Sequence, residues 1–240
     1  MNVSQIELSL TPDLYKWRTI KSGHTTVAVD VLRATTAICA AFTAGADEIV
    51  PLDSLEALSA YHQEGYLRAA ERGGRKVDGA EYGNSPCEYL SSNLRGKRLA
   101  YSTTNGTVAI LKGADADRTL VGCFSNIDAL AKELLDKPQD LVILCSGWQN
   151  DFSVEDTLFA GALCHKLISS SLYSSHNDAV AMAMTLWSNC GNDPYAYSIK
   201  HASHVERLLG FGAADDIAFA FKQNTCTVVP RLCDGKLKCP

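Results

Sequence analysis

The sequence lacks the long apolar runs of a membrane protein and the charge excess of a nucleic-acid-binding protein. No continuous apolar stretch approaches the roughly 18 residues that a membrane-spanning helix needs, and residues 1–10 carry neither the basic residue nor the apolar core of a secretory signal. The 22 basic and 27 acidic residues give a net charge of −5, and the basic clusters are short. We therefore expect a cytoplasmic protein that binds neither a membrane nor a nucleic acid.

Several familiar cysteine, histidine and glycine motifs are also missing. The nine cysteines include no C-x-x-C pair, which argues against a zinc ribbon or a thioredoxin-like site. Cys39 and Cys145 lie in apolar segments, which predicts buried, reduced thiols. His201 and His204 are three residues apart and could bind a metal together, but helix caps or surface positions are favoured. No Walker loop or G-x-S-x-G elbow occurs.

The first two-thirds of the chain alternates apolar runs typical of strands with segments typical of helices. The expected strands cover residues 27–32, 49–50, 97–102, 119–121 and 141–145. The expected helices cover residues 35–43, 54–63, 86–93, 125–135 and 154–168. This alternation, with 46% hydrophobic residues, predicts an α/β fold, a layered α/β/α single domain with a mixed sheet.

The last quarter of the chain is expected to be mostly helical. The serine-rich residues 169–177 predict a linker. Helices are expected at 178–187, from Asp193-Pro194 onward, and after a capping box at Ser203 to Glu206, with the last of them ending at Gly210. Residues 226–229 predict a strand. We expect one domain over residues 1–240, with a possible helical subregion at 178–222.

The first candidate site segment follows the strand at 27–32. Asp30 and Arg33 precede Thr35 and Thr36, which open a helix. Because a helix N-terminus presents free N–H groups, this order predicts an anion site. Arg33 could hold a phosphate or sulfonate through two hydrogen bonds. An ordinary helix cap beside a surface ion pair is the alternative.

A second segment also joins a strand to a helix. Its hydroxyls, amide and glycine would donate hydrogen bonds to a ligand with little steric bulk. The donors are Thr103, Thr104, Asn105, Gly106 and Thr107. The alternative is a tight Asn-Gly turn, which needs no ligand.

Two further segments supply acids. Residues 71–86 contain Glu71 and Glu81, which are oxygen ligands of the kind that Mg²⁺ takes, and end on Asn84 and Ser85 before a helix. Solvated loop carboxylates are the alternative. In residues 146–156, the acids Glu155 and Asp156 open a helix, where a capping box from Ser153 would explain them equally well.

Together, the motifs VAVDVLRATT, GNSP, STTNGT and SVEDTLFAG resemble the 2-phosphosulfolactate phosphatase family, Mg²⁺-dependent phosphatases of coenzyme M biosynthesis. The likeness covers about residues 27–167 and 201–230. It implies a single α/β domain that hydrolyses a small anionic 2-phospho acid, most simply 2-phosphosulfolactate to sulfolactate and phosphate. The family's usual Gly-Phe-Asp is Gly79-Ala80-Glu81 here and its Gly-Glu is Ala70-Glu71, which bears on substrate identity.

The resemblance also implies roles for the four segments. Asp30, Arg33 and Asp156 would be catalytic, with Asp30 either a Mg²⁺ ligand or the nucleophile. The expected metal ligands are Asp30, Glu71, Glu81, Glu155 and Asp156. The expected substrate-binding residues are Thr35, Thr36, Asn84, Ser85, Thr103, Thr104, Asn105, Gly106 and Thr107.

Two other functions stay open at this point. A non-catalytic phospho-acid-binding or sensor protein would keep the same donor segments without turnover. A thiol enzyme using Cys145 is disfavoured because no histidine is near it in the sequence. A homodimer is the base-rate expectation for the oligomeric state.

Overall fold

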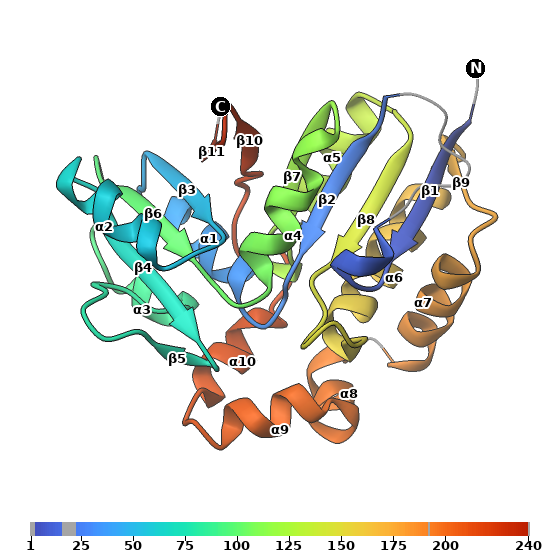
Figure 1. Cartoon of the computed structure of the whole chain (residues 1–240). Coiled ribbons are helices and arrows are strands. Elements are labelled where there is room, and N and C mark those ends of the chain that lie inside the picture. Colours follow the sequence, from blue (N-terminus) through green and yellow to red (C-terminus); the bar gives the residue numbers. More distant parts are fainter. Residues whose placement is uncertain (1–2, 16–22, 192, 240) are drawn as a thin grey trace.

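The computed structural model describes residues 3–15, 23–191 and 193–239, and its centre is one mixed sheet with helices on both faces (Figure 1). The strands are β1 Ser4–Ser9, β2 Thr25–Val29, β3 Glu48–Leu52, β4 Leu67–Arg72, β5 Arg75–Lys76, β6 Arg98–Ser102, β7 Arg118–Gly122, β8 Leu141–Cys145, β9 Tyr173–Ser174, β10 Arg231–Cys233 and β11 Lys236–Lys238. The helices are α1 Ala34–Thr43, α2 Glu56–Gln63, α3 Pro86–Leu90, α4 Gly106–Lys112, α5 Ile127–Asp136, α6 Val154–Ile168, α7 Asp178–Asn189, α8 Pro194–His201, α9 Ser203–Leu209 and α10 Ala214–Ala220. The α/β expectation is confirmed.

The sheet consists of two parallel groups joined by the C-terminal hairpin. Its strand order is β5-β4-β6-β3-β11-β10-β7-β2-β8-β1-β9. Strands β4, β6 and β3 run parallel to one another, as do β7, β2, β8, β1 and β9, while β10 and β11 pair antiparallel with β7 and β3. The last residues of the chain therefore complete the sheet that the first residues begin.

Strand β8 shows how the sheet separates two cores. Leu141, Ile143 and Cys145 face a cluster that includes side chains of α5 and α6, whereas Val142 and Leu144 face Ala109 of α4 and Tyr15 on the other side. This period of two is what a strand buried on both faces requires.

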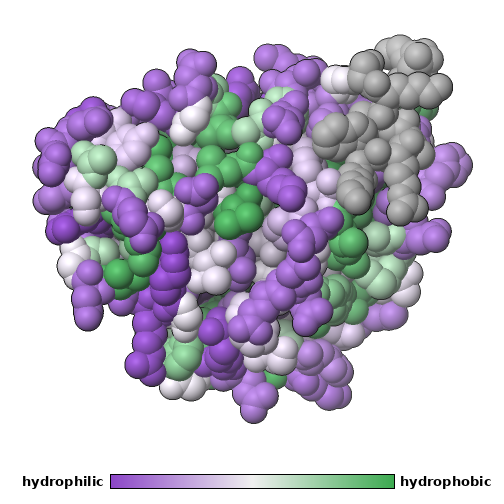
Figure 2. All heavy atoms as spheres, in the orientation of Figure 1, coloured by the Kyte–Doolittle hydropathy of each residue, from purple (hydrophilic) through white to green (hydrophobic). Residues whose placement is uncertain are grey.

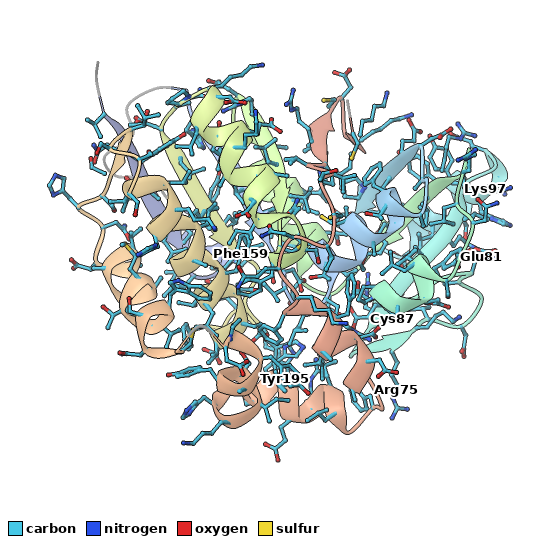
Figure 3. All side chains as sticks on the ribbon, turned by 180° about the vertical axis from the view of Figure 1, so that it is seen from behind. Arg75, Glu81, Cys87, Lys97, Phe159 and Tyr195 are labelled. Carbon is cyan, nitrogen blue, oxygen red and sulfur yellow. The ribbon has the colours of Figure 1, made fainter. Side chains whose placement is uncertain are left out.

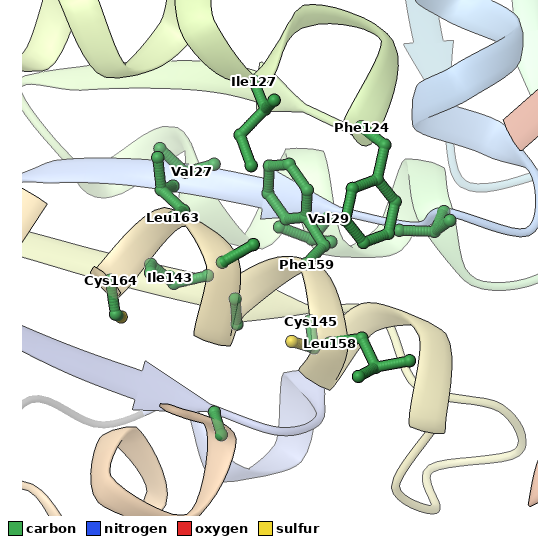
Figure 4. Close-up of a cluster of buried hydrophobic side chains, with 14 of the residues drawn as sticks. Val27, Val29, Phe124, Ile127, Ile143, Cys145, Leu158, Phe159, Leu163 and Cys164 are labelled. Carbon is green, nitrogen blue, oxygen red and sulfur yellow. The ribbon is translucent and has the colours of Figure 1, made fainter. Parts of the chain in front are cut away.

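Aromatic rings fill the larger core. Figure 4 shows Phe124 and Phe159 beside Val27 and Val29 of β2, and the two rings meet edge to face with centroids 5.5 Å apart. On the molecular face in Figure 2, hydrophobic residues form separate patches among hydrophilic ones. Within the described residues, no helix combines the length and apolarity needed to cross a membrane.

Most expected elements are confirmed, and α6 and β8 have the expected bounds. The strand expected at 226–229 is wrong, because β10 begins at Arg231 and pairs with β7. The capping box at Ser203 is also wrong, since Ala202 is the N-cap of α9 and makes no side-chain capping bond. The linker expected at 169–177 contains β9, which extends the sheet beside β1. The sequence did not indicate β1, β4 or β5.

The cysteine prediction holds. All nine cysteines are free thiols, and both Cys39 and Cys145 are fully buried. Burial also raises the pKa of the Cys145 thiol well above its ordinary value. A buried, protonated thiol is a poor nucleophile, which removes the main support for a thiol enzyme.

Candidate functional site

A small pocket lies between the ends of β2, β4 and β6 and helix α9. Its volume of about 90 Å³ suits a compact anion, since pockets for drug-sized ligands measure roughly 300–1,000 Å³. It is lined by Asp30, Leu32, Arg33, Glu71, Gly73, Gly74, Asn84, Thr104, Asn105, Trp148, Gln149, His204, Arg207 and Leu208.

Asp30 follows the last residue of β2 and fixes the start of α1. Its Oδ1 accepts a hydrogen bond from the Ala34 N–H at 3.1 Å, and its carbonyl accepts one from the Thr35 hydroxyl at 2.8 Å. Helix α4 begins directly against this turn at Gly106. A Cβ at Gly106 would lie 2.6 Å from Asp30 Oδ2 and 2.3 Å from Ala34 Cβ, so only glycine permits this close approach.

The hydroxyls expected to bind substrate divide into two groups. Thr35 and Thr36 are buried and donate to backbone carbonyls inside their own turn, so they shape the site without lining the pocket. Thr103 and Thr107 hydrogen-bond to each other across the start of α4. Thr104 faces the pocket.

The neighbouring amides and hydroxyls are divided in the same way. Asn105 and Asn84 line the pocket, and the Tyr101 hydroxyl donates to the Asn84 side chain. Ser85 caps α3 and donates to Asp216 Oδ1 at 2.6 Å, and it faces an adjoining cavity.

Glu155 and Asp156 lie side by side in the first turn of α6, both 2% exposed. Asp156 accepts hydrogen bonds from the Val31 N–H at 2.8 Å and from the Gly147 N–H at 3.2 Å, and so ties the loop after β8 to the turn after β2. Glu155 Oε1 lies 3.8 Å from His204 Nδ1, and among the described residues Glu155 Oε2 has no hydrogen-bond partner.

These buried acids repel one another. Burial, then the charge of Asp156, raises the pKa of Asp30 to about 8 and that of Glu155 to about 8. Burial also raises the pKa of Asp156 to about 6, although its hydrogen bonds oppose the shift. A cation in this cluster would offset the cost of ionising it.

The structure separates Glu71 and Glu81, the two glutamates of residues 71–86. Glu71, near the end of β4, accepts a hydrogen bond from the Gly74 N–H at 2.5 Å and one from the Thr104 N–H at 3.3 Å, which joins two of the segments at the pocket. Glu81 instead binds Arg68 at 2.8 Å, and this ion pair lowers the pKa of Glu81 to about 2. Figure 3 shows Glu81 at the outer edge of this half of the sheet.

Arg33 lines the pocket, but its terminal nitrogens already have partners. Nη1 donates to Asp216 Oδ2 of α10 at 2.7 Å, and Nη2 donates to the Gly74 carbonyl at 2.7 Å. The residue is 8% exposed. The guanidinium therefore joins the turn after β2 to α10 and to the β4–β5 hairpin.

Helix α9 contributes Arg207, which the sequence did not single out, and His204, which it singled out only as half of a possible metal pair. Arg207 stacks on the Trp148 ring, with 4.8 Å between the guanidinium carbon and the ring centroid. Arg207 Nη2 donates to His204 Nε2 at 3.3 Å, because arginine can only donate. Burial, then the charge of Arg207, lowers the pKa of His204 to about 4, so this ring is neutral. His201 stacks on Tyr197, with ring centroids 4.4 Å apart.

The chemistry of the donors fits a magnesium ion that keeps water ligands. Across the described part of the chain, no three His, Cys, Asp or Glu side chains are grouped so that they could hold a metal by themselves. Mg²⁺ is commonly held by one or two carboxylates together with waters and substrate phosphate oxygens. Asp30 beside the pocket and the unpartnered Glu155 Oε2 are donors of that kind.

Comparison with known proteins places these features in one family. The family model described as 2-phosphosulpholactate phosphatase matches residues 9–235. A "Probable 2-phosphosulfolactate phosphatase" of Caldanaerobacter subterraneus is 34% identical over 87% of this chain and 88% of its own length. Relatives of the same name from a Nostoc species and Gloeobacter violaceus are 38% and 36% identical, covering 85% and 95% of this chain and 86% and 94% of their own.

Proposed function

Because this chain belongs to the 2-phosphosulfolactate phosphatase family, whose members are phosphoric monoester hydrolases, we propose that it hydrolyses 2-phosphosulfolactate to sulfolactate and phosphate with Mg²⁺ as cofactor. The observation that carries this proposal is the pocket itself. It brings all four predicted polar segments together at the strand ends, and Asp156 of the fourth segment bonds to the Val31 N–H directly behind Asp30.

The two sides of the pocket supply different parts of the reaction. Thr104 and Asn105 line the pocket with neutral side chains that can bind phosphoryl oxygens without adding charge, and the Thr104 N–H and hydroxyl also donate to Glu71 at 3.3 Å. Asp30 lies next to them, with the Ala34 N–H holding one of its oxygens in place. Asp156 positions Asp30 by fixing the Val31 backbone. Bound Mg²⁺ would neutralise phosphate charge and orient the ester for in-line attack.

Asp30 has two compatible roles, which differ in a measurable product. As a nucleophile it would attack phosphorus, release the sulfolactate oxygen and form an aspartyl phosphate that water then hydrolyses. As a metal ligand it would form no covalent intermediate. Acid-quenching a reaction on labelled substrate within one turnover separates the two roles, because only the first leaves labelled phosphate on the protein.

The proposal is tested by phosphate release from a panel of 2-phospho acids, with Mg²⁺ and with EDTA. The panel contains 2-phosphosulfolactate, phospholactate and phosphoglycolate. We expect Mg²⁺-dependent release that is fastest for phosphosulfolactate. Folded protein that binds these acids and releases no phosphate would contradict the proposal and support a sensor. Full activity in EDTA would contradict the magnesium assignment.

A further inference from the structure

We propose that Arg207 of α9 binds the sulfonate of the substrate and so selects phosphosulfolactate over phospho acids that lack this group. The inference rests on the proposed function, because it assigns a second subsite within the same pocket.

Arg207 makes no ion pair within the described residues, in contrast to Arg33. Arg33 has Asp216 at 2.7 Å, whereas no carboxylate among the described residues lies within 4.0 Å of Arg207. Its Nε is buried and, within the described structure, has no hydrogen-bond partner. A half-buried guanidinium with an unused donor costs solvation that a bound anion would recover.

The surroundings hold this guanidinium ready for a ligand. The Trp148 ring supports its face, the Gly73 carbonyl accepts from Nη1 at 3.3 Å, and His204 accepts from Nη2. These contacts fix the plane of the group without neutralising it, since all three partners are uncharged. A fixed, planar fork of donors suits the oxygens of a sulfonate or carboxylate.

The pocket also separates this cation from the phosphoryl-binding donors. Thr104 and Asn105 belong to the loop after β6, whereas Arg207 belongs to α9, which crosses the ends of the strands (Figure 1). In 2-phosphosulfolactate, the sulfonate sulfur is one atom farther from the carbon that bears the phosphate than the carboxylate carbon is. We therefore assign Arg207 to the sulfonate, the more distant anion.

The test compares two substrates in matched variants. Arg207→Met keeps an unbranched apolar stem and removes the charge, Arg207→Lys keeps the charge, and Arg75→Met is the control. Arg75 stacks on Phe211, as Arg207 does, but lines the adjoining cavity. Figure 3 shows Arg75 near the C-terminal helices.

We expect Arg207→Met to lower kcat/KM for phosphosulfolactate roughly 10- to 100-fold, mainly through KM, as expected for loss of a charged hydrogen bond. Phospholactate turnover should change less than about threefold, since that substrate lacks the sulfonate. Arg207→Lys should restore part of the preference, and Arg75→Met should leave it unchanged. An equal loss on both substrates, or no loss on either, would overturn the assignment.

A binding measurement separates this inference from the proposed hydrolysis. Calorimetric titration of sulfolactate and of lactate into the wild-type protein needs no turnover. A preference for sulfolactate that Arg207→Met abolishes supports the subsite even if the protein hydrolyses neither phospho acid. Equal binding of the two ligands by the wild-type protein, or a preference that survives Arg207→Met, would overturn it.

Discussion

The ends of the strands and helix α9 are two walls of one pocket, and they differ in charge: the strand ends carry acids, with Arg33 paired to Asp216, whereas α9 carries an arginine. The strand ends contribute Asp30 and Glu71, with Glu155 and Asp156 behind them, whereas α9 contributes Arg207, which makes no ion pair among the described residues. Asp30 and Glu71 each accept a hydrogen bond from a backbone N–H of their own turn, whereas Asp156 accepts one from the distant Val31. We call the strand-end acids the acidic wall and α9 with Arg207 the cationic wall. We expect the acidic wall to perform the reaction and the cationic wall to select the substrate.

The largest effect is expected from removing the carboxylate charge of Asp30, the acid that lines the pocket at the end of β2. We expect Asp30→Asn to lower kcat about 10³-fold or more, because both candidate roles of Asp30 need a carboxylate charge. Steady-state phosphate release measures the loss, and circular dichroism with a thermal melt shows that the variant is folded. A folded variant with near-normal kcat would place the chemistry elsewhere.

The next largest effect concerns the connection between the two walls. Asp216→Asn leaves the buried Arg33 without its counter-charge, which we expect to lower the free energy of unfolding by about 3–5 kcal/mol. Urea denaturation measures this change. The double variant Arg33→Met/Asp216→Leu should lose less than Asp216→Asn alone, because it leaves no unpaired buried charge. An equal or larger loss would mean that the pair does not link these elements as described.

The raised pKa values of Asp30, Glu155 and Asp156 should make the stability of the protein depend on pH. Unfolded carboxyls ionise near pH 4, whereas Asp30, Glu155 and Asp156 hold protons in the fold up to about pH 6 to 8. The folded state therefore binds more protons between about pH 4 and 8, and the stability of the metal-free protein falls as the pH rises through that window.

Mg²⁺ should reverse this loss by binding the ionised acids. We expect the rise in Tm on adding Mg²⁺ to be larger at pH 8.5 than at pH 6, as measured by thermal melts with Mg²⁺ or EDTA. The same rise at both pH values would show that Mg²⁺ does not bind these acids.

The smallest effect is expected for Glu81, which lies outside the acidic wall. Glu81→Gln should change kcat/KM less than about twofold and lower the free energy of unfolding by at most about 1 kcal/mol, because its ion pair with Arg68 is about one-third exposed. The matched variant Glu71→Gln should lower activity clearly, since Glu71 lines the pocket. A larger loss of activity in Glu81→Gln than in Glu71→Gln would contradict the assignment.

Local patterns in the sequence predicted the acidic wall well and the cationic wall poorly. Asp30, Glu155 and Asp156 each stand where an apolar run changes its period from two to about four, and that signal needs no partner elsewhere in the chain. Arg33 and Asp216 are 183 residues apart, and Arg207 and Gly73 are 134 apart. No local pattern contains such contacts, so the partner of Arg33 and the role of α9 could not be predicted.

The predicted site residues that lie away from the pocket have the same explanation. Glu71 and Glu81 look alike in sequence, and they differ because Tyr82 pairs with Ala69 and brings Glu81 beside Arg68. The hydroxyls of Thr35 and Thr36 donate hydrogen bonds to backbone carbonyls of their own turn, so they do not face the pocket. Strand pairing and hydrogen-bond competition decide such cases, and neither is visible in residue type or spacing.

The most direct test of the central claim is a crystal structure with Mn²⁺ in place of Mg²⁺ and with sulfolactate bound. The two-walled pocket predicts an anomalous Mn²⁺ peak within about 2.2 Å of a carboxylate oxygen of Asp30 or Glu155. It also predicts the sulfonate beside the guanidinium of Arg207. A metal peak at Glu81, or a sulfonate bound away from α9, would contradict it.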